Sequence, residues 1–208
     1  MRNTIFFTGA PGSRWSGVAQ QIGKLPNVNH SDENPNRSFE HSAIHGSFSG
    51  HKGSYFGPGM EFGANFDQIP KLLPFEIQAE VDRAFPDKNQ EQLRIVKGHI
   101  FSYYLDSLRR VFPDSMYMMV WRDSDVSLKW WLELGGFSIP YPRYEWYVNE
   151  ETMKRRIQEE NRAIEGFCDR NRISLEPFTP EWVEKNFGRR LDFDPAAYFT
   201  GVKVALAR

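Results

Sequence analysis

Short apolar runs along the chain alternate with segments in which apolar residues recur at helical spacing. Residues 4–7, 93–97 and 116–121 are short stretches rich in aromatic, β-branched and aliphatic side chains, and they stop at turn-forming or polar residues. Stretches of this kind predict β-strands, and the unbroken run at 116–121 predicts a central parallel strand covered on both faces. Residues 173–176 predict one further strand of the same sheet.

Helical spacing of apolar residues fills the intervals between these strands. It predicts helices over residues 14–22, 68–85, 103–111, 125–134 and 150–172, with a short one after Pro180. The second of these should become regular near Pro74, because proline fits the first turn of a helix but not its interior. Strands that alternate with helices predict one α/β domain over residues 1–208, in which a mainly parallel sheet has helices on both faces.

The stretch from about residue 27 to residue 67 interrupts this alternation. It is rich in Gly, Ser, Asn and His and shows no sustained periodicity. Segments of this length without secondary structure are uncommon as simple connectors, and long loops in compact domains often carry binding residues. We therefore expect an ordered insertion that faces a substrate.

Composition and charge narrow the class of protein. The chain has 208 residues, 40% of them hydrophobic, which is enough for one substantial core. Its 26 basic and 27 acidic residues leave a formal charge of −1, so overall charge favours neither nucleic acid nor a membrane as partner. No signal core or membrane span is visible, and the single cysteine, Cys168, cannot form an internal disulfide. These features predict a cytoplasmic protein.

The first predicted strand runs into a loop of mostly small residues, Gly9-Ala10-Pro11-Gly12-Ser13-Arg14-Trp15-Ser16. Small residues ahead of a helix let backbone N–H groups converge on an anion, so this loop is a candidate phosphate site. It is not a Walker A motif, because Arg14 stands where that motif has glycine and Trp15 where it has lysine. This departure argues against a nucleoside triphosphate bound with magnesium.

Basic residues and a histidine stand at the ends of two further predicted strands. Lys97 and His99 close the strand near residue 95, and Arg122 follows the strand at 116–121. Ligands of parallel α/β sheets bind beyond the carboxyl ends of the strands, so these residues and the small-residue loop are predicted to form one site. The structural alternatives are a hydrogen-bonding role for His99 and an ion pair of Arg122 with the aspartates that follow it.

These segments resemble sulfotransferases that use 3′-phosphoadenosine-5′-phosphosulfate (PAPS). Residues 94–99, Arg-Ile-Val-Lys-Gly-His, are similar to the strand of that family that ends in Lys-Thr-His, with Gly98 in place of threonine. Residues 112–127 are similar to the family's Phe-Pro-Asp turn, apolar strand, arginine and following helix. The resemblance covers the start of the chain and about residues 93–131, and it implies a P-loop-type fold.

The resemblance also implies how a sulfuryl group would be transferred. His99 would be the general base that takes the proton of an acceptor hydroxyl. Lys97 and Arg14 would stabilise the charge that develops on the departing phosphate. No metal ion is expected, and the acceptor would be a small molecule or a glycan, bound beside the insertion at about 27–67.

The cofactor would lie between the small-residue loop and Arg122. In the family, the loop holds the 5′-phosphosulfate, while an arginine and a serine of the following helix bind the 3′-phosphate. Ser127 or Lys129 has to replace that serine here. The predicted cofactor-binding residues are therefore Pro11, Gly12, Ser13, Arg14, Trp15, Ser16, Arg122, Ser127 and Lys129.

Two other functions remain open on the sequence. The family's C-terminal Arg-Lys-Gly and Gly-Asp-Trp-Lys region is missing, with Gly188-Arg189-Arg190 as the nearest substitute, so the chain is alternatively a binding module without catalysis. A small-molecule or nucleotide kinase of the same fold is the second alternative.

The sequence offers further candidates for the site. Glu61 is an alternative general base to His99. The remaining histidines, predicted to be solvated, are His30, His41, His45 and His51, and the aromatic candidates for a pocket wall or for the core are Phe48, Tyr55, Phe56, Trp130, Trp131, Tyr141, Tyr144 and Trp146.

Overall fold

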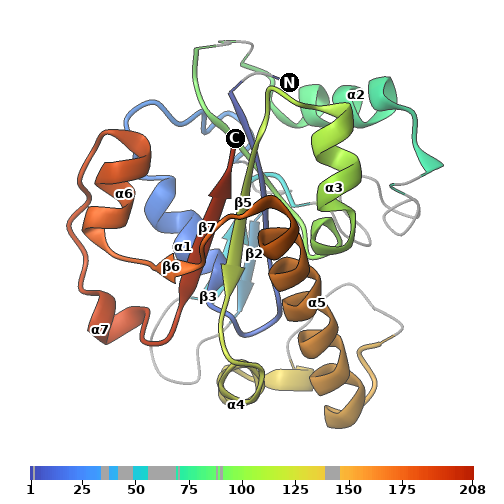
Figure 1. Ribbon diagram of the computed structural model, residues 1–208, viewed down its shortest axis with the longest axis vertical. Helices are drawn as coiled ribbons and strands as arrows, with labels where there is room; N and C mark the ends of the chain where they lie inside the picture. Colours follow the sequence, from blue (N-terminus) through green and yellow to red (C-terminus); the bar gives the residue numbers. More distant parts are fainter. Residues whose placement is uncertain are drawn as a thin grey trace.

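One sheet runs through the centre of the molecule, with its strands in the spatial order β4-β1-β5-β7-β6 (Figure 1). The computed structural model describes residues 1, 3–33, 38–41, 49–55, 69, 71–87, 89, 91–138 and 146–208, with the backbone alone at 38–41 and 49–52. The strands of the sheet are β1 (Thr4–Gly9), β4 (Arg94–Lys97), β5 (Met116–Trp121), β6 (Glu176–Pro177) and β7 (Lys203–Ala207).

The sheet is mixed, which corrects the expectation of a mainly parallel one. β4, β1 and β5 are parallel neighbours, whereas β7 pairs antiparallel with β5, and β6 pairs antiparallel with β7. Apolar runs reveal that a strand is buried but not which way it runs, so the sequence could not give the direction of the last two strands. The prediction of a strand at residues 173–176 is only partly right, because β6 begins at Glu176.

The predicted helices are all present, and Pro74 begins the second of them as expected. The long helix starts where the side chain of Asn149 accepts a hydrogen bond from the backbone N–H of Thr152. The helices are α1 (Trp15–Ile22), α2 (Pro74–Ala84), α3 (Phe101–Val111), α4 (Ser124–Glu133), α5 (Glu150–Asn171), α6 (Pro180–Phe187) and α7 (Pro195–Tyr198), and a 3₁₀ turn, η3 (Gly136–Ser138), follows α4.

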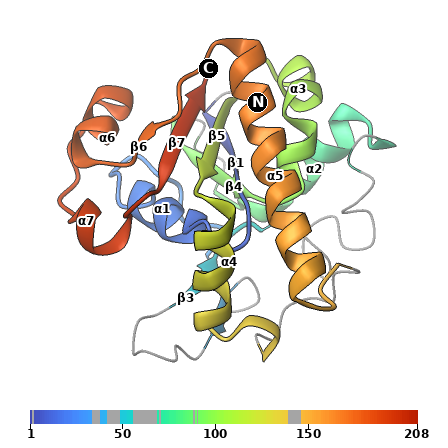
Figure 2. The same ribbon diagram turned by 60° about the horizontal axis from the view of Figure 1, so that its bottom comes forward.

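Helices cover both faces of the sheet because side chains alternate along its strands (Figure 2). In β1, Phe6 packs into a core shared with α2, α3 and α5. Its neighbours Ile5 and Phe7 point the other way, into a core shared with α1 and α6. A third cluster, which includes Ala10 and Trp131, joins the loop after β1 to α4 and α5. The structure is thus an α/β domain with a mixed sheet between two helical layers.

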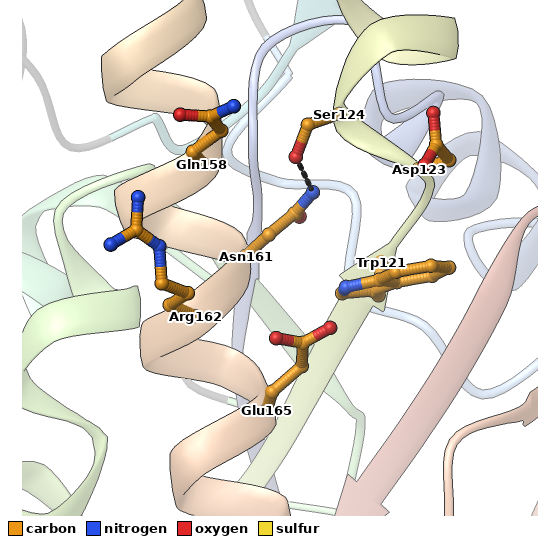
Figure 3. Close-up of a pocket in the computed structure, with 7 residues that line it drawn as sticks. All are labelled: Trp121, Asp123, Ser124, Gln158, Asn161, Arg162 and Glu165. Carbon is orange, nitrogen blue, oxygen red and sulfur yellow. Dashed lines mark hydrogen bonds between the residues drawn. The ribbon is translucent and has the colours of Figure 1, made fainter.

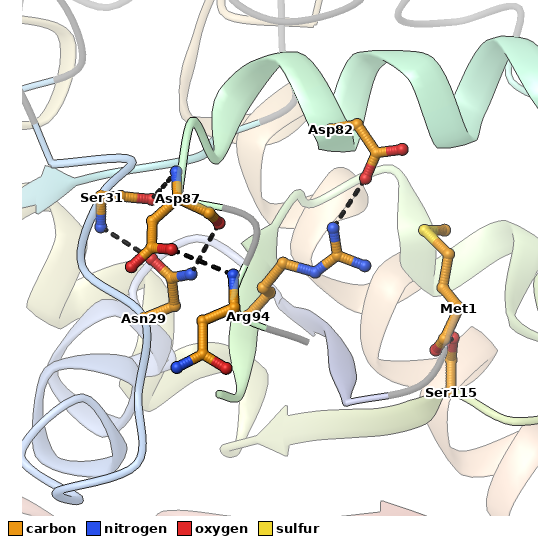
Figure 4. A network of polar contacts seen from close by, with 8 residues as sticks. Met1, Asn29, Ser31, Asp82, Asp87, Arg94 and Ser115 are labelled. Carbon is orange, nitrogen blue, oxygen red and sulfur yellow. Dashed lines mark hydrogen bonds and ion pairs between the residues drawn. The ribbon is translucent and has the colours of Figure 1, made fainter. Parts of the chain in front are cut away.

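Polar contacts tie together the amino ends of the parallel strands (Figure 4). Arg94, the first residue of β4, donates to Asp82 of α2 at 2.7 Å. Ser115, just before β5, donates to the carbonyl oxygen of Met1 at 2.7 Å. These contacts close the end of the sheet where the strands begin, which is opposite to the end where ligands of α/β sheets bind.

Part of the predicted insertion at 27–67 is ordered secondary structure that the composition did not reveal. β2 (Ser38–His41) and β3 (Ser49–Lys52) form an antiparallel pair. Beyond β3 the chain lies along the end of β4, where the backbone N–H of Lys97 donates to the carbonyl of Ser54 at 3.0 Å. Tyr55 is fully buried there. The end of β3 therefore leads directly to the carboxyl end of β4.

Candidate anion-binding site

The three predicted strand ends lie side by side. β4, β1 and β5 are adjacent and run in the same direction, with Phe7 beside Lys97 and Gly9 beside Val120. The residues that follow them, the loop after Gly9, His99 and Arg122, therefore share one edge of the sheet. The last of these leads into α4, which lies below the strand ends in Figure 1.

His99 is held under the loop after β1. Its imidazole is only 4% exposed, and Nδ1 lies 2.6 Å from the carbonyl oxygen of Gly9. A carbonyl can only accept, so Nδ1 carries a proton and Nε2 of the neutral ring has the free lone pair. The rings of Trp15 and Tyr55 pack against the imidazole, with centroids 4.6 and 6.1 Å away. The residue is thus fixed in one tautomer and covered on the side of α1.

A buried carboxylate supports the same imidazole. Glu160 of α5 has no exposed surface, and its Oε2 lies 3.5 Å from Nδ1 of His99. Arg156, one turn earlier, donates from Nε to Oε1 of Glu160 at 2.6 Å. Burial alone would lower the pKa of Arg156, but the charge and hydrogen bond of Glu160, together with the neighbouring Tyr103 and Glu159, raise that pKa overall. Arg156, Glu160 and His99 therefore form one buried chain of charged and polar groups.

Sequence reasoning did not identify Glu160. The signal that would have revealed it is its position on the buried stripe of α5, between Ile157 and Ile164, where an apolar residue is expected. A carboxylate at such a position needs a partner, and Arg156 stands four residues before it, at the spacing of helical neighbours.

Arg14 and Arg122 converge on one indole. The guanidinium of Arg14 lies 4.6 Å from the ring centroid of Trp130, and that of Arg122 lies 5.8 Å from it. Arg14 also donates from Nε to the carbonyl oxygen of Tyr198 at 3.1 Å. Burial and, second, the charge of Arg122 lower the pKa of Arg14. Two like charges thus act on each other in a partly buried place, which is costly unless an anion offsets them.

Arg122 lacks acceptors for part of its guanidinium. Its Nε and Nη1 are buried without a hydrogen-bond partner, and burial lowers its pKa. The ion pair that was its structural alternative is not formed, because Asp123 caps α4 and Asp125 pairs with Lys154 at 2.8 Å. Buried polar atoms nearly always have partners, so these two nitrogens mark a place for a ligand with acceptor oxygens.

The loop between β1 and α1 is shaped by close packing. Gly12 has a φ of 74°, and a Cβ there would overlap the backbone carbonyl of Ser127 in α4. Arg14 precedes α1 with a φ of 70°, and no side chain caps the first turn of that helix. The hydroxyl of Ser13 is buried without a partner, whereas Pro11 is buried and Ser16 is half-buried. The amino end of α1 thus keeps backbone donors for an anion.

Lys97, which is predicted to act at the phosphosulfate, is a largely buried residue at the end of β4. Its side chain is 8% exposed, and its charge lowers the pKa of Asp32, although burial outweighs this and raises that pKa overall. Asp32 also accepts from the backbone N–H of Ser54 at 2.5 Å. Because side chains alternate, Lys97 shares the face of β4 with Ile95, under the segment that follows β3. Part of its charge is therefore already balanced inside the protein.

Lys129 and Arg190 each form ion pairs with neighbouring carboxylates. Lys129 is exposed on α4, with its ammonium 4.0 Å from Glu133. Ser127 is buried beside the site, and its hydroxyl donates to the carbonyl of Arg122 at 3.3 Å. Arg190 forms ion pairs with the carboxylates of α6, the nearer at 2.5 Å, while Gly188 ends that helix. Of the two substitutes for the family's serine, Ser127 is the one next to Arg122.

The other candidates have varied positions. Tyr55 and Trp131 are core residues, Trp146 lies over the guanidinium of Arg156, and His30 forms an exposed pair with Glu33 at 2.7 Å. Glu61, His45, Phe48, Phe56, Tyr141 and Tyr144 lie outside the described residues, as do the side chains of His41 and His51.

Within the described ranges, no helix is long and apolar enough to cross a membrane. The same residues contain no cluster of three or more histidine, cysteine or acidic side chains able to hold a metal ion. No protein-family model matches the chain, and no curated protein or solved structure shows significant similarity to it. The geometry at the strand ends is therefore the guide to function.

Proposed function

We propose that this chain is a sulfotransferase that uses PAPS and transfers its sulfuryl group to an acceptor hydroxyl or amine. The observation that carries the proposal is the pair formed by Arg14 and Arg122, in which two nitrogens of Arg122 are buried and have no acceptor. A cationic pair at the carboxyl edge of parallel strands suits a ligand that bears phosphate groups. The motifs at residues 94–99 and 112–127 favour PAPS among such ligands.

The residues present fit the two ends of this cofactor. The uncapped first turn of α1, with Ser13 and Arg14, would hold the 5′-phosphosulfate. Arg122 would hold the 3′-phosphate with two parallel hydrogen bonds, which the planar guanidinium makes readily. Ser127 would support Arg122 through its backbone rather than bind the phosphate itself, because its hydroxyl already donates to the carbonyl of Arg122.

When bound, PAPS would supply an activated sulfuryl group with a good leaving group. His99 would act on the acceptor, since its Nδ1 is committed to Gly9 and its Nε2 has the free lone pair. The carboxylate of Glu160, 3.5 Å from Nδ1, is placed as a counter-charge for the imidazole after it takes the proton of the acceptor. Arg14 and the amino end of α1 would stabilise the charge left on the cofactor.

A binding module without catalysis is the second candidate, and one observation favours it. The rings of Trp15 and Tyr55 pack against His99, which restricts the approach of an acceptor to this imidazole. The cationic pair would then still bind a phosphate ester, but no group would be transferred. Nothing comparable favours a kinase, because Trp15, at the position of the Walker A lysine, is part of the buried core.

Calorimetric titration separates these functions. The purified chain is titrated with 3′-phosphoadenosine-5′-phosphate without magnesium, and separately with ATP and magnesium. Binding of the first ligand with micromolar affinity, much tighter than that of ATP, supports the proposed cofactor site. Sulfate release or transfer from PAPS in an acceptor screen then distinguishes a transferase from a binding module. Failure of 3′-phosphoadenosine-5′-phosphate to bind would rule out the proposed cofactor, and turnover of ATP with magnesium would indicate a kinase.

A further inference from the structure

A separate pocket lies between the end of β5, the start of α4 and the middle of α5 (Figure 3). Its volume is about 330 Å³. Trp121, which precedes Arg122, contributes to it, but neither Arg122 nor Arg14 nor His99 lines it. The lining residues are Trp121, Asp123, Ser124, Gln158, Asn161, Arg162 and Glu165.

Two buried polar atoms of this pocket lack partners. Asn161 is 3% exposed, and its Nδ2 donates to the carbonyl of Arg122 at 2.8 Å and to the hydroxyl of Ser124 at 3.0 Å. These acceptors fix the orientation of the amide, and its Oδ1 is left buried without a donor. The indole Nε1 of Trp121 is likewise buried and unpaired, and Figure 3 shows this edge of the ring directed toward α5.

The unpaired atoms define the chemistry of an occupant. Nε1 of Trp121 can only donate, and Oδ1 of Asn161 can only accept. A hydroxyl is a small neutral group that serves both, because it accepts one hydrogen bond while donating another. Leaving both atoms unpaired would cost about 1–3 kcal/mol each, so the pocket is built for a polar occupant.

The rim of the pocket carries charged side chains of both signs. Asp123 and Glu165 bring carboxylates that accept hydrogen bonds, and Arg162 brings a guanidinium that donates them, so the charges partly offset one another. The ammonium of Lys203 lies 5.1 Å from the ring centroid of Trp121, so one face of the indole is covered and its N–H edge is what the pocket offers. The lining therefore offers both donors and acceptors, which matches a neutral molecule with several hydroxyls.

We propose that this pocket binds one sugar unit through its hydroxyl groups, with Trp121 and Asn161 as the central contacts. The proposal does not rest on sulfuryl transfer, because no residue of the cationic pair lines the pocket. The two places are nevertheless joined through the bond from Asn161 to the backbone of Arg122. A glycan held here would extend from a site directly beside the anion-binding residues.

The test uses nuclear magnetic resonance of the full ¹⁵N-labelled chain, titrated with the methyl glycosides of glucose, galactose and N-acetylglucosamine. The indole N–H of Trp121 and the side-chain amide of Asn161 should shift saturably with at least one of them. Glycerol, sodium acetate and ethylamine serve as probes for a simple polyol, an anion and a cation. Saturable binding of glycerol, acetate or ethylamine in place of every glycoside would overturn the sugar assignment, and so would the absence of any shift with the glycosides.

Variants keep the test independent of folding. Trp121→Phe removes one N–H donor but retains an aromatic ring, and it should weaken the glycoside by about fivefold, the equivalent of one neutral hydrogen bond. Glu165→Gln keeps the shape of the rim and should weaken glycoside binding less than Trp121→Phe does. Asp169→Ala, on α5 but outside the pocket, is the matched control and should bind as the unaltered chain does. Equal affinity in all three variants would place the sugar elsewhere.

The outcome is separable from that of the proposed cofactor site. Arg122→Ala should leave glycoside binding nearly unchanged while it weakens 3′-phosphoadenosine-5′-phosphate, because Arg122 contributes only its backbone carbonyl to Asn161. Glycoside binding without nucleotide binding would support the sugar pocket and reject the cofactor site. The reverse result would reject the pocket alone.

Discussion

Arg14 and Arg122 approach the same indole, that of Trp130, with their guanidinium carbons 4.6 and 5.8 Å from its centroid. Burial lowers the pKa of both groups, and for Arg14 the charge of Arg122 adds to this effect. The pair is therefore held at a cost that a bound anion would remove. An anion bound here should also stabilise the fold, because it binds the folded chain and not the unfolded one.

Replacing Arg122 tests this pair directly. Arg122→Ala should weaken the binding of 3′-phosphoadenosine-5′-phosphate by about 1.5–3 kcal/mol, which is the contribution of a charged hydrogen bond. Calorimetry would record this as a loss of roughly ten- to more than a hundredfold. Arg83→Ala is the matched control, because Arg83 is exposed and pairs with Glu80 of its own helix. Equal losses in both variants would show that the anion is bound by overall charge alone.

His99→Ala should separate binding from transfer. Nucleotide affinity should remain nearly intact, since the hydrogen bond from the imidazole to the loop is made to the backbone carbonyl of Gly9. Transfer of the sulfuryl group should be abolished, because the acceptor would lose its general base. Transfer that survives in this variant, measured with labelled PAPS, would remove His99 from the mechanism.

The buried pair of Arg156 and Glu160 should couple strongly in stability. Glu160→Gln leaves a buried guanidinium without its counter-ion, so we expect a loss of about 3–5 kcal/mol in the free energy of unfolding. Adding Arg156→Met in the same chain should recover part of that loss, because no charge is then left unpaired. Urea denaturation of the two single variants and the double variant measures the coupling. Additive losses would mean that the two side chains do not depend on each other.

The ¹⁵N resonances of His99 give a second measure of how Glu160 acts on the imidazole. In the unaltered chain at neutral pH, ¹⁵N spectra should report the proton on Nδ1, where Gly9 and Glu160 both lie within 3.5 Å. Glu160→Gln keeps the bond to Gly9 and should retain this tautomer, whereas the resonance of Nδ1 itself should move. The Nδ1 resonance of Glu160→Asp should lie between those of the unaltered chain and of Glu160→Gln. An unchanged Nδ1 resonance in both variants would show that Glu160 does not act on the imidazole.

Gly12 and Gly188 provide a matched comparison that tests the close packing of the loop between β1 and α1. Both have φ near 70°, but a Cβ at Gly12 would overlap the carbonyl of Ser127, whereas a Cβ at Gly188 would meet nothing within 4 Å. Gly188→Ala should therefore cost only about 1–2 kcal/mol, the penalty of the left-handed backbone. Gly12→Ala should cost more in thermal or urea unfolding, and it should weaken anion binding because the loop must move. Similar losses for the two variants would contradict the close packing.

Cys168 should report on opening of the core. Burial raises the pKa of its thiol to about 11, so the thiol stays protonated at neutral and mildly alkaline pH. We expect negligible labelling by 5,5′-dithiobis(2-nitrobenzoic acid) at pH 8 in the folded chain and complete labelling in urea. Fast labelling of the folded chain would show that α5 separates readily from the sheet.

The edge that holds the site could be foreseen because its signals are local. A strand that stops at Gly9, another that stops before His99 and a third that stops at Arg122 are each visible as the end of an apolar run. Parallel strands bring such ends together, so the three segments were predicted to be neighbours. Pro74 likewise marks the start of α2 by its own backbone chemistry.

The remaining features depend on contacts between distant segments. The resemblance of residues 94–99 assigns Lys97 to the cofactor, but it gives no sign of Asp32, with which the charge of Lys97 interacts and which stands 65 positions earlier in the sequence. The support from Glu160 reaches His99 from α5, 61 positions later in the sequence. No local pattern encodes such pairs. The direction of β7 was hidden for the same reason, since pairing with β5 is decided by the sheet and not by residues 203–207 alone.

The late position of β7 has a consequence for biosynthesis. β5 is the central strand, yet one of its edges is paired only by residues 203–207. During synthesis that edge stays open while residues 122–202 are added, and open strand edges readily pair with other chains. Nascent chains that stall before β7 should therefore be substrates for chaperones, even though the residues of the candidate anion-binding site have already been made.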